Sequence, residues 1–307
     1  MRTYLLILTI LFCSCKQVDS DDWIDRTKHE GLNDIHYSES FETYCTEKNP
    51  DNIKNTVDNL EQAKEYFDKT FKEDLNFAVL FVDNANWNKY AFSPPPGMPQ
   101  AHFQGNMVLG LGRSVIAMGA EQGLKQVPDS KLGILKQHFG EELNLDLFYR
   151  DALALHELGH LYQFYKTGKG TQRHWLNEVF GNLCQVAAAK NLSTQDVFNR
   201  MDVFQLFLIN SNQWGELKFK SLNQFEEDYF EVLKQGRNYG WYQTKFYIQA
   251  KELYSKFGDE FLNEFRDFLI DINPDKVGII EDKELKELMI NTFGNEVVKI
   301  LEWNHDS

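Results

Sequence analysis

Two histidines and two glutamates stand at a spacing that strongly restricts how this chain can fold. Residues 156 to 160 read His-Glu-Leu-Gly-His, and Glu178 follows His160 by eighteen positions. Residues four apart on an α-helix project from the same face, so His156 and His160 can present imidazole nitrogens to one metal ion. Glu157 points about a quarter-turn away, from where its carboxylate can reach a metal-bound water. Apolar residues at helical spacing on both flanks predict a helix with one buried side.

Glu178 is the best candidate for a third metal ligand. A catalytic zinc usually keeps three protein ligands and an open position for water, and two histidines leave one ligand missing. Residues 168 to 173 form a turn-rich segment, and residues 174 to 190 read as a second helix. An antiparallel return of this helix would carry Glu178 back over the histidines. Asn182, one turn after Glu178, could then hydrogen-bond a ligand histidine.

The segment from Trp175 to Glu178 carries a family resemblance. Together with the His-Glu-x-x-His motif, Trp-Leu-Asn-Glu resembles gluzincin zinc metallopeptidases, the clan that contains thermolysin and the aminopeptidase N family. Phe180 also matches, whereas Val179 and Gly181 stand where that family has Gly and Ala. The resemblance covers residues 147 to 190 most clearly.

The resemblance implies a mechanism and a cofactor. One Zn²⁺ ion would be held by His156, His160 and Glu178, and Glu157 would be the general base that activates a water for peptide hydrolysis. A tyrosine would hydrogen-bond the oxyanion of the tetrahedral intermediate. Tyr242, which precedes a long helix, is the expected residue, and Tyr239 and Tyr247 are its rivals.

The resemblance also implies an edge strand beside the cleft that pairs with the substrate backbone. The expected strand begins at residue 106, with Asn106, Met107, Val108 and Leu109 as the substrate-binding positions. The segment by which the aminopeptidase family captures a free amino terminus is absent, so aminopeptidase specificity does not follow from the resemblance.

The order of apolar patterns predicts an α+β fold. Residues 51 to 72 have helical periodicity, residues 75 to 82 read as a buried strand, and further β structure is expected from 107 to 118. Nearly everything after the zinc helices reads as helix. We therefore expect a small α/β lobe with an edge strand over residues 31–145. The zinc helices and a mainly α-helical lobe would follow over residues 146–307, in a gluzincin-like arrangement.

The amino terminus predicts export and a lipid anchor. Residues 1–14 combine one basic residue with a short apolar run, as in a signal peptide, and Cys15 stands where a bacterial lipoprotein is lipidated. Cys13 is an alternative acceptor, and an ordinary cleaved signal is an alternative fate. Residues 15–30 would form a lipidated polar tether. These features predict an extracytoplasmic protein, held on a bacterial membrane or cell surface by the lipid on Cys15.

Charge and cysteine content limit the remaining possibilities. The formal net charge is −14, which argues against nucleic-acid binding. Cys45 and Cys184 could pair in an oxidising compartment, but two isolated cysteines are more typical of singly buried thiols.

The resulting hypothesis is a zinc-dependent metallopeptidase that acts on a peptide or protein substrate. Two alternatives remain open at this stage. One is a non-catalytic lipoprotein that binds peptides or other ligands on a peptidase fold, and the other is a zinc hydrolase of a non-peptide substrate.

Overall fold

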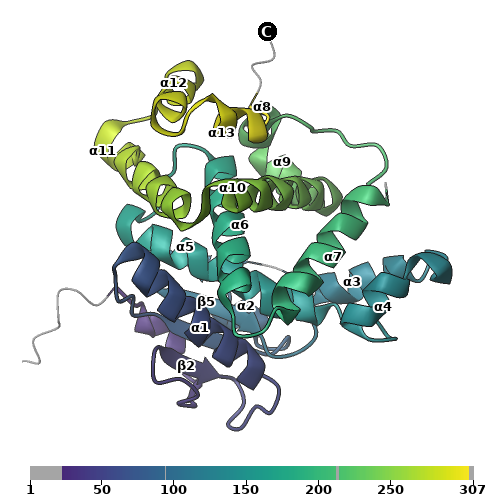
Figure 1. The fold of residues 1–307 in the computed structure, drawn as a ribbon. Coiled ribbons are helices and arrows are strands. Elements are labelled where there is room, and N and C mark those ends of the chain that lie inside the picture. The colour runs from purple at the N-terminus through teal and green to yellow at the C-terminus, as the bar shows by residue number, and fades with distance from the viewer. Residues whose placement is uncertain (1–22, 94, 212–213, 304–307) are drawn as a thin grey trace, which may run out of the picture.

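The computed structural model describes residues 23–93, 95–211 and 214–303, and this part of the chain has an α+β fold. A small sheet lies at one end of the molecule, and the helices stack away from it toward the carboxyl-terminal end (Figure 1). The predicted signal peptide (1–14), the lipid on Cys15 and the first part of the tether lie outside the described residues. Residues 23 to 30 belong to the folded part, since Ile24 and His29 are buried, so the tether predicted for residues 15–30 ends earlier than expected.

In the described residues, five strands form one sheet in the order β1-β2-β3-β5-β4. The strands β2, β3 and β5 run parallel, and β1 and β4 run antiparallel at the two edges. Their bounds are β1 Asn33–Asp34, β2 Glu42–Cys45, β3 Ala78–Val82, β4 Gln100–His102 and β5 Asn106–Gly110.

The strand β3 explains why the sheet is covered on both faces. Successive side chains of a strand point to opposite faces. Val79 and Phe81 pack in the core that includes the apolar side of α1 (Lys54–Phe71), whereas Leu80 packs on the other side with Trp87 of α2 (Trp87–Tyr90). The uninterrupted apolar run of residues 75 to 82 reflects this double burial.

The strand β5 is an inner strand, which corrects the prediction that Asn106, Met107, Val108 and Leu109 form the edge beside the cleft. β5 pairs with β3 on one side and with β4 on the other, and these four residues are fully buried. Its backbone is therefore not free to pair with a substrate. The edge strand at the cleft is β4. We did not predict it because its three residues follow a proline-rich loop and show no alternation.

The chain is almost entirely helical after β5, and α3 begins at Val115, earlier than the predicted end of β structure at residue 118. Ser114 caps α3 by accepting a hydrogen bond from the backbone N–H of Ala117. The helices include the short 3-10 helices η1 (Arg26–His29) and η2 (Asp129–Lys131) and the π-helix η3 (Leu147–Ala152). The α-helices are α3 Val115–Leu124, α4 Gly133–Phe139, α5 Leu153–Thr167, α6 His174–Asn191, α7 Asp196–Asn210, α8 Leu222–Glu227, α9 Tyr229–Lys234, α10 Gly236–Asp271, α11 Pro274–Val277, α12 Asp282–Phe293 and α13 Asn295–Ile300.

Helix α6 lies at the centre of the helical part, between α5 and the long helix α10 (Figure 1). A kink at Gly258, where φ is 66°, divides α10 into two helical segments. The guanidinium of Arg266 in α10 is buried and donates to the carbonyl oxygen of Tyr162 in α5 at 2.8 Å and to Glu73 at 2.6 Å. This contact fixes α5, the helix with the two histidines, against the rest of the core.

One further prediction concerns the two cysteines of the described residues. Cys45 and Cys184 are buried free thiols, which confirms the interpretation of singly buried cysteines. No helix among the described residues is long and apolar enough to cross a membrane.

Candidate metal centre

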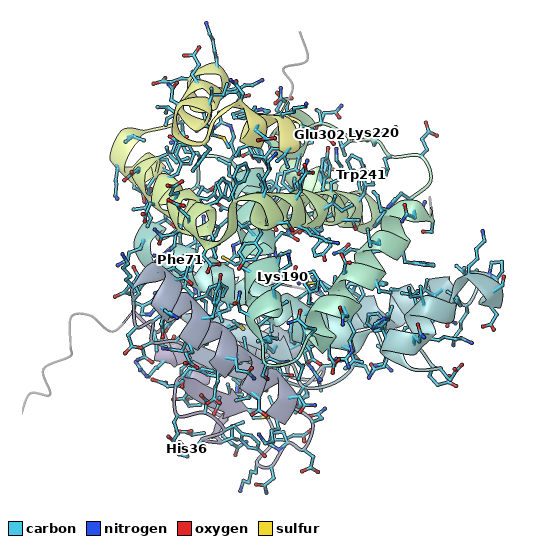
Figure 2. The ribbon with its side chains drawn as sticks, in the orientation of Figure 1. His36, Phe71, Lys190, Lys220, Trp241 and Glu302 are labelled. Carbon is cyan, nitrogen blue, oxygen red and sulfur yellow. The ribbon has the colours of Figure 1, made fainter. Side chains whose placement is uncertain are left out.

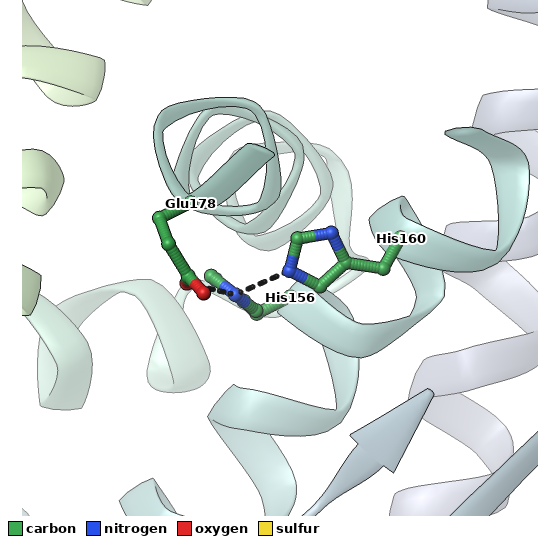
Figure 3. A group of neighbouring side chains, drawn as sticks. All are labelled: His156, His160 and Glu178. Atoms are coloured by element: carbon green, nitrogen blue, oxygen red, sulfur yellow. Dashed lines mark hydrogen bonds and ion pairs between the residues drawn. The ribbon is translucent and has the colours of Figure 1, made fainter. Parts of the chain in front are cut away.

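Helices α5 and α6 bring His156, His160 and Glu178 together as a buried group that could hold a metal ion. These three residues are called the metal group below. Figure 3 shows the two imidazoles of α5 and the carboxylate of α6 pointing toward one another. The Nε2 atoms of His156 and His160 are 2.9 Å apart, and Nε2 of His156 is 3.4 Å from Oε2 of Glu178. All three ligand atoms lie within 4.8 Å of one another.

These distances suit a small tetrahedral cation. Zn–N and Zn–O bonds of roughly 2.0–2.1 Å in a tetrahedral site place neighbouring ligand atoms about 3.3 Å apart. The two measured separations from Nε2 of His156 bracket that value. Two nitrogens and one carboxylate oxygen are also a donor set that zinc accepts, and they leave one position for water. The donor set therefore fits the expected ion.

Two glycines allow α5 and α6 to approach this closely. A Cβ atom at Gly159 would lie 2.4 Å from Cβ of Cys184, inside the contact distance of two carbon atoms. A Cβ atom at Gly181 would lie 2.6 Å from Cε1 and Nε2 of His156 and 2.9 Å from Nε2 of His160. The imidazole rings thus occupy the space that any other residue at position 181 would fill.

The π-helix η3 leads into α5 and widens the helix just before the histidines. Such turns are frequent at functional sites. Gln185 of α6 donates to the carbonyl oxygen of Ala152 at 2.9 Å, where η3 ends. Phe148 and Tyr149 of η3 line the cleft beside the metal group.

The ligand charges are strongly coupled. Burial opposes the charged form of His156, but the hydrogen bond to Glu178 and the negative charges of Glu157 and Glu178 outweigh it and raise the pKa of His156. Burial also opposes the charge on Glu178, yet the bond to His156 and the nearby histidine charges lower its pKa to about 2. Burial and the charge of His156 lower the pKa of His160 to about 4. The raised pKa of His156 and the lowered pKa of Glu178 both result from the attraction between these two side chains.

Hydrogen bonds orient His160 and the loop beyond it. Nδ1 of His160 lies 3.4 Å from Oε1 of Gln163, whose Nε2 donates to Oδ1 of Asn177 at 2.6 Å. Thr171 donates to the same Asn177 oxygen at 2.9 Å. If Nδ1 carries the proton that Gln163 accepts, Nε2 of His160 is free to ligate. Gln163 is one turn from His160, so helical spacing alone could have identified this partner.

Asn182 does not contact a ligand histidine, which corrects its predicted role. Its side-chain amide donates to the backbone carbonyl of Glu178 at 2.9 Å and to Oε1 of Gln243 at 3.0 Å. Gln243 in turn donates to Oε2 of Glu178 at 2.7 Å. Asn182 therefore positions the carboxylate ligand through Gln243, while Nδ1 of His156 is buried without a hydrogen-bond partner among the described residues.

Glu157 points into the cleft from the helix face next to the histidines. Its Oε2 accepts a hydrogen bond from the backbone N–H of Ala101 in the edge strand β4 at 2.7 Å. Burial raises the pKa of Glu157 to about 7, against the lowering effect of the His156 charge. A carboxyl with this pKa can take up and release a proton near neutral pH.

Tyr242 lies away from the metal group, which corrects its predicted role as the oxyanion tyrosine. Its hydroxyl donates to the backbone carbonyl of Ser221 at 2.7 Å, and it lines a separate small pocket with Lys220 and Glu302. Figure 2 shows Lys220 and Glu302 at the carboxyl-terminal end of the molecule. Tyr247, one of the two rivals, donates to Asp202 at 3.0 Å.

Tyr239 is the predicted candidate that the structure places at the metal group. Its hydroxyl donates to Oε1 of Glu178 at 3.2 Å, and its ring lines the cleft. Burial, followed by the negative charge of Glu178, raises the pKa of Tyr239 well above its usual value, so the hydroxyl keeps its proton. Tyr229 of α9, which we did not predict as a site residue, also lines the cleft and stacks on His174 with ring centroids 3.9 Å apart.

The start of α6 is held by side chains from distant elements. Oε2 of Glu226 in α8 accepts from the backbone N–H of His174 at 2.7 Å, and its Oε1 is 2.8 Å from Nδ1 of the same histidine. Just before the helix, Arg173 donates to Asp282 at the start of α12. These contacts fix the direction of α6 and hence the position of Glu178 relative to α5.

The metal group opens into a cleft of about 990 Å³. Its walls include residues of β4, α3, η3, α5, α6, α7, α9 and α10, so it lies between the sheet end and the helical end. Comparisons with protein-family models, curated proteins and solved structures gave no match.

Proposed function

We propose that this chain is a zinc-dependent peptidase that hydrolyses peptide bonds with a water activated by Glu157. One observation carries the proposal: His156, His160 and Glu178 converge next to the Glu157 carboxylate, at the wall of a cleft large enough for a peptide segment. A metal site that only stabilised the fold would need neither the Glu157 carboxylate nor the open cleft. The gluzincin resemblance belongs to this proposal and is supported by the same residues.

The donor set supports zinc as the ion. When bound, Zn²⁺ would supply a water with a pKa of about 7 and would polarise the scissile carbonyl. The side chains of His156, His160 and Glu178 would hold it, and Gln163, Gln243 and Asn182 would keep those ligands in place.

The remaining steps use groups of this chain. Glu157 takes a proton from the attacking water and delivers it to the leaving amine, a change for which its raised pKa is suited. The N–H of Ala101 in β4 orients the Glu157 carboxylate. The proposed oxyanion donor is the hydroxyl of Tyr239, which would turn from Glu178 toward the substrate; its hydrogen bond to Glu178 supports this role.

The location of the protein is part of the proposal and rests on the sequence. We propose that the mature chain begins at a lipidated Cys15 and acts outside the cytoplasm, on a membrane or cell surface. Mass spectrometry of the amino-terminal peptide would show a diacylglyceryl adduct on Cys15; an unmodified mature amino terminus elsewhere would contradict the anchor.

The function is tested by separating metal binding from catalysis. Glu157→Gln should keep one zinc per chain and lower peptide hydrolysis by about 10²–10⁴-fold, because the general base is lost while the ligands remain. His160→Ala should lose both zinc and activity. His138→Ala, outside the metal group, is the matched control and should change neither.

Zinc content by atomic spectroscopy and digestion of a peptide library, with and without chelator, give the two measurements. Hydrolysis by Glu157→Gln at the wild-type rate, or unchanged zinc content in His160→Ala, would contradict the proposal. Peptide binding without cleavage by the zinc-loaded wild type would favour the non-catalytic alternative instead.

A further inference from the structure

The lining of the metal cleft has a charge composition that differs from the rest of the chain. The sequence contains 46 Asp and Glu against 32 Lys and Arg. Among the described residues that line the cleft, however, only Glu157 and Glu178 are acidic, whereas Lys169 and Arg237 are basic. Acidic side chains are thus depleted from the cleft, except at the two positions that the metal site uses.

Both cleft carboxylates are already engaged. Oε2 of Glu157 accepts from the N–H of Ala101, and Glu178 accepts from Tyr239 and Gln243 while it faces His156. In the proposed mechanism Glu178 holds the ion and the remaining oxygen of Glu157 faces the attacking water, so neither carboxylate is available to an ammonium group of a substrate. An ammonium that enters such a cleft loses water without gaining a counter-ion, which strongly disfavours its binding.

The two basic side chains that line the cleft, unlike the two carboxylates, are available to a bound ligand. Lys169, in the connection between α5 and α6, lies 4.1 Å from the ring centroid of Phe103 and forms no ion pair with a described residue. Arg237, in the first turn of α10, is exposed and likewise forms no ion pair with a described residue. Both can therefore pair with carboxylates of a bound chain.

Apolar side chains form most of the cleft wall and continue onto its rim. The inner wall includes side chains from η3, α5 and α7, namely Phe148, Tyr149, Leu153, Phe204 and Leu208. At the rim, Ile116, Phe230 and Leu233 line the cleft and are exposed, with Phe230 72% exposed. Exposed apolar side chains around a cleft indicate contact with an apolar ligand.

We infer that the cleft binds an internal, apolar stretch of polypeptide flanked by acidic side chains and excludes a free amino terminus. The enzyme is then an endopeptidase, and it cleaves amino-blocked peptides faster than peptides in which the apolar pair carries the free amine. This inference rests on the proposed function, because it assigns the substrate class of the same site.

A set of matched peptides tests the inference on the zinc-loaded protein. The reference peptide has a Glu-Ala-Phe-Leu-Ala-Glu core, acetylated and amidated at its ends. In two variants Gln or Lys replaces both flanking glutamates, and in a third the Phe-Leu pair begins the chain with a free amine. We expect kcat/KM to fall about tenfold from the Glu-flanked to the Lys-flanked peptide, as for two partly exposed ion pairs. The free-amine peptide should be slower by about a hundredfold or more.

Binding measurements separate this inference from the catalytic proposal. Calorimetric titration of the zinc-loaded Glu157→Gln variant gives Kd for each peptide without turnover, and the same order of preference is expected. The double variant Lys169→Gln/Arg237→Gln should reduce the difference between Glu-flanked and Lys-flanked peptides to within about twofold. Its matched control, Lys48→Gln/Lys299→Gln, removes two exposed cations outside the cleft and should preserve the difference.

The outcomes are distinguishable. Stepwise release of amino-terminal residues from the free-amine peptide, or tighter binding of the Lys-flanked peptide, overturns the inference and leaves the peptidase proposal standing. If no peptide is cleaved, the proposed function fails, and the binding order alone still decides whether the cleft prefers acidic-flanked, amino-blocked chains.

Discussion

At the scale of single residues, Gly181 decides whether the two imidazoles can lie against α6. Because an added Cβ would lie 2.6 Å from the His156 ring, Gly181→Ala should push the imidazoles away from Glu178 without changing any ligand. We expect zinc affinity to fall by about 10- to 100-fold, the range seen when the surroundings of a ligand are disturbed. Competition with a chromogenic chelator measures this change.

Gly119→Ala is the matched control for this prediction. Gly119 also lies in a helix, and an added Cβ there meets nothing within 4 Å. This substitution should leave zinc affinity unchanged and should stabilise the helix slightly. Equal zinc affinities of Gly181→Ala and Gly119→Ala would show that the rings do not need the space at position 181.

Glu157 should make the stability of the metal-free protein depend on pH. Folding raises its pKa from 4.5 to about 7. Its stabilising contribution is therefore complete below about pH 4.5 and is lost as pH rises through about 7, because the folded state must then hold an ionised carboxylate. Glu157→Gln has no ionisable carboxyl at this position, so it should not lose stability as the pH rises. The glutamine still offers an acceptor for the Ala101 N–H.

The measurement is urea unfolding of the metal-free wild type and Glu157→Gln at about pH 5 and about pH 8. The free energy of unfolding of the variant, relative to the wild type, should be higher at the upper pH by about 1–3 kcal/mol. The free energy that corresponds to the whole pKa shift of Glu157 is larger, and solvent in the cleft screens part of it. A difference between the proteins that does not change with pH would contradict the raised pKa.

At the scale of elements, the rotation of α10 about its axis determines which tyrosine lies next to Glu178. Tyr239 and Gln243 are four residues apart, so they share the helix face that contacts Glu178. Tyr242 lies on another face and bonds Ser221. Tyr239→Phe should lower kcat/KM by about 10²–10³-fold, the cost of one lost oxyanion donor.

Tyr242→Phe is the paired variant for this helix. It should leave kcat/KM unchanged and lower the free energy of unfolding by about 1 kcal/mol, because the Ser221 carbonyl loses its donor. Zinc content is measured for both proteins, since Tyr239 also bonds a ligand. A loss of activity in Tyr242→Phe with full activity in Tyr239→Phe would reverse the assignment.

At the scale of the whole molecule, a bound ion would link α5, which packs on the sheet and α1, to α6, which packs on α10. Because the three ligands come together only in the folded chain, zinc should stabilise it. At a free zinc concentration of about one hundred times Kd, we expect about 2.7 kcal/mol of added stability. Thermal unfolding with zinc, with chelator and with Mg²⁺, a cation that prefers oxygen ligands, measures the effect. An equal rise of the melting temperature in wild type and His160→Ala would place the stabilising ion elsewhere.

Much of the fold could be predicted because its signals are local. The apolar periodicity of residues 51 to 72 and 174 to 190 became α1 and α6, and the buried run of residues 75 to 82 contains β3. The short strands β1, β2 and β4 were missed because two to four residues carry too little pattern. β5 was placed at the edge because the family resemblance implied an edge strand there, and the pattern of one strand does not encode its pairing partners.

The three candidate metal ligands could be identified from the sequence alone, because their relation depends on one helical turn and one short connection. His156 and His160 share a face through the helix repeat, and Glu178 returns to them across the connection between α5 and α6. The tyrosine, the strand edge and the charges that lie next to these three residues depend on the tertiary structure. Tyr239 is 61 residues from Glu178 along the chain, and Ala101 is 56 residues from Glu157. At such separations, the packing of whole helices and the order of strands in the sheet set the contacts, and no local residue pattern specifies either.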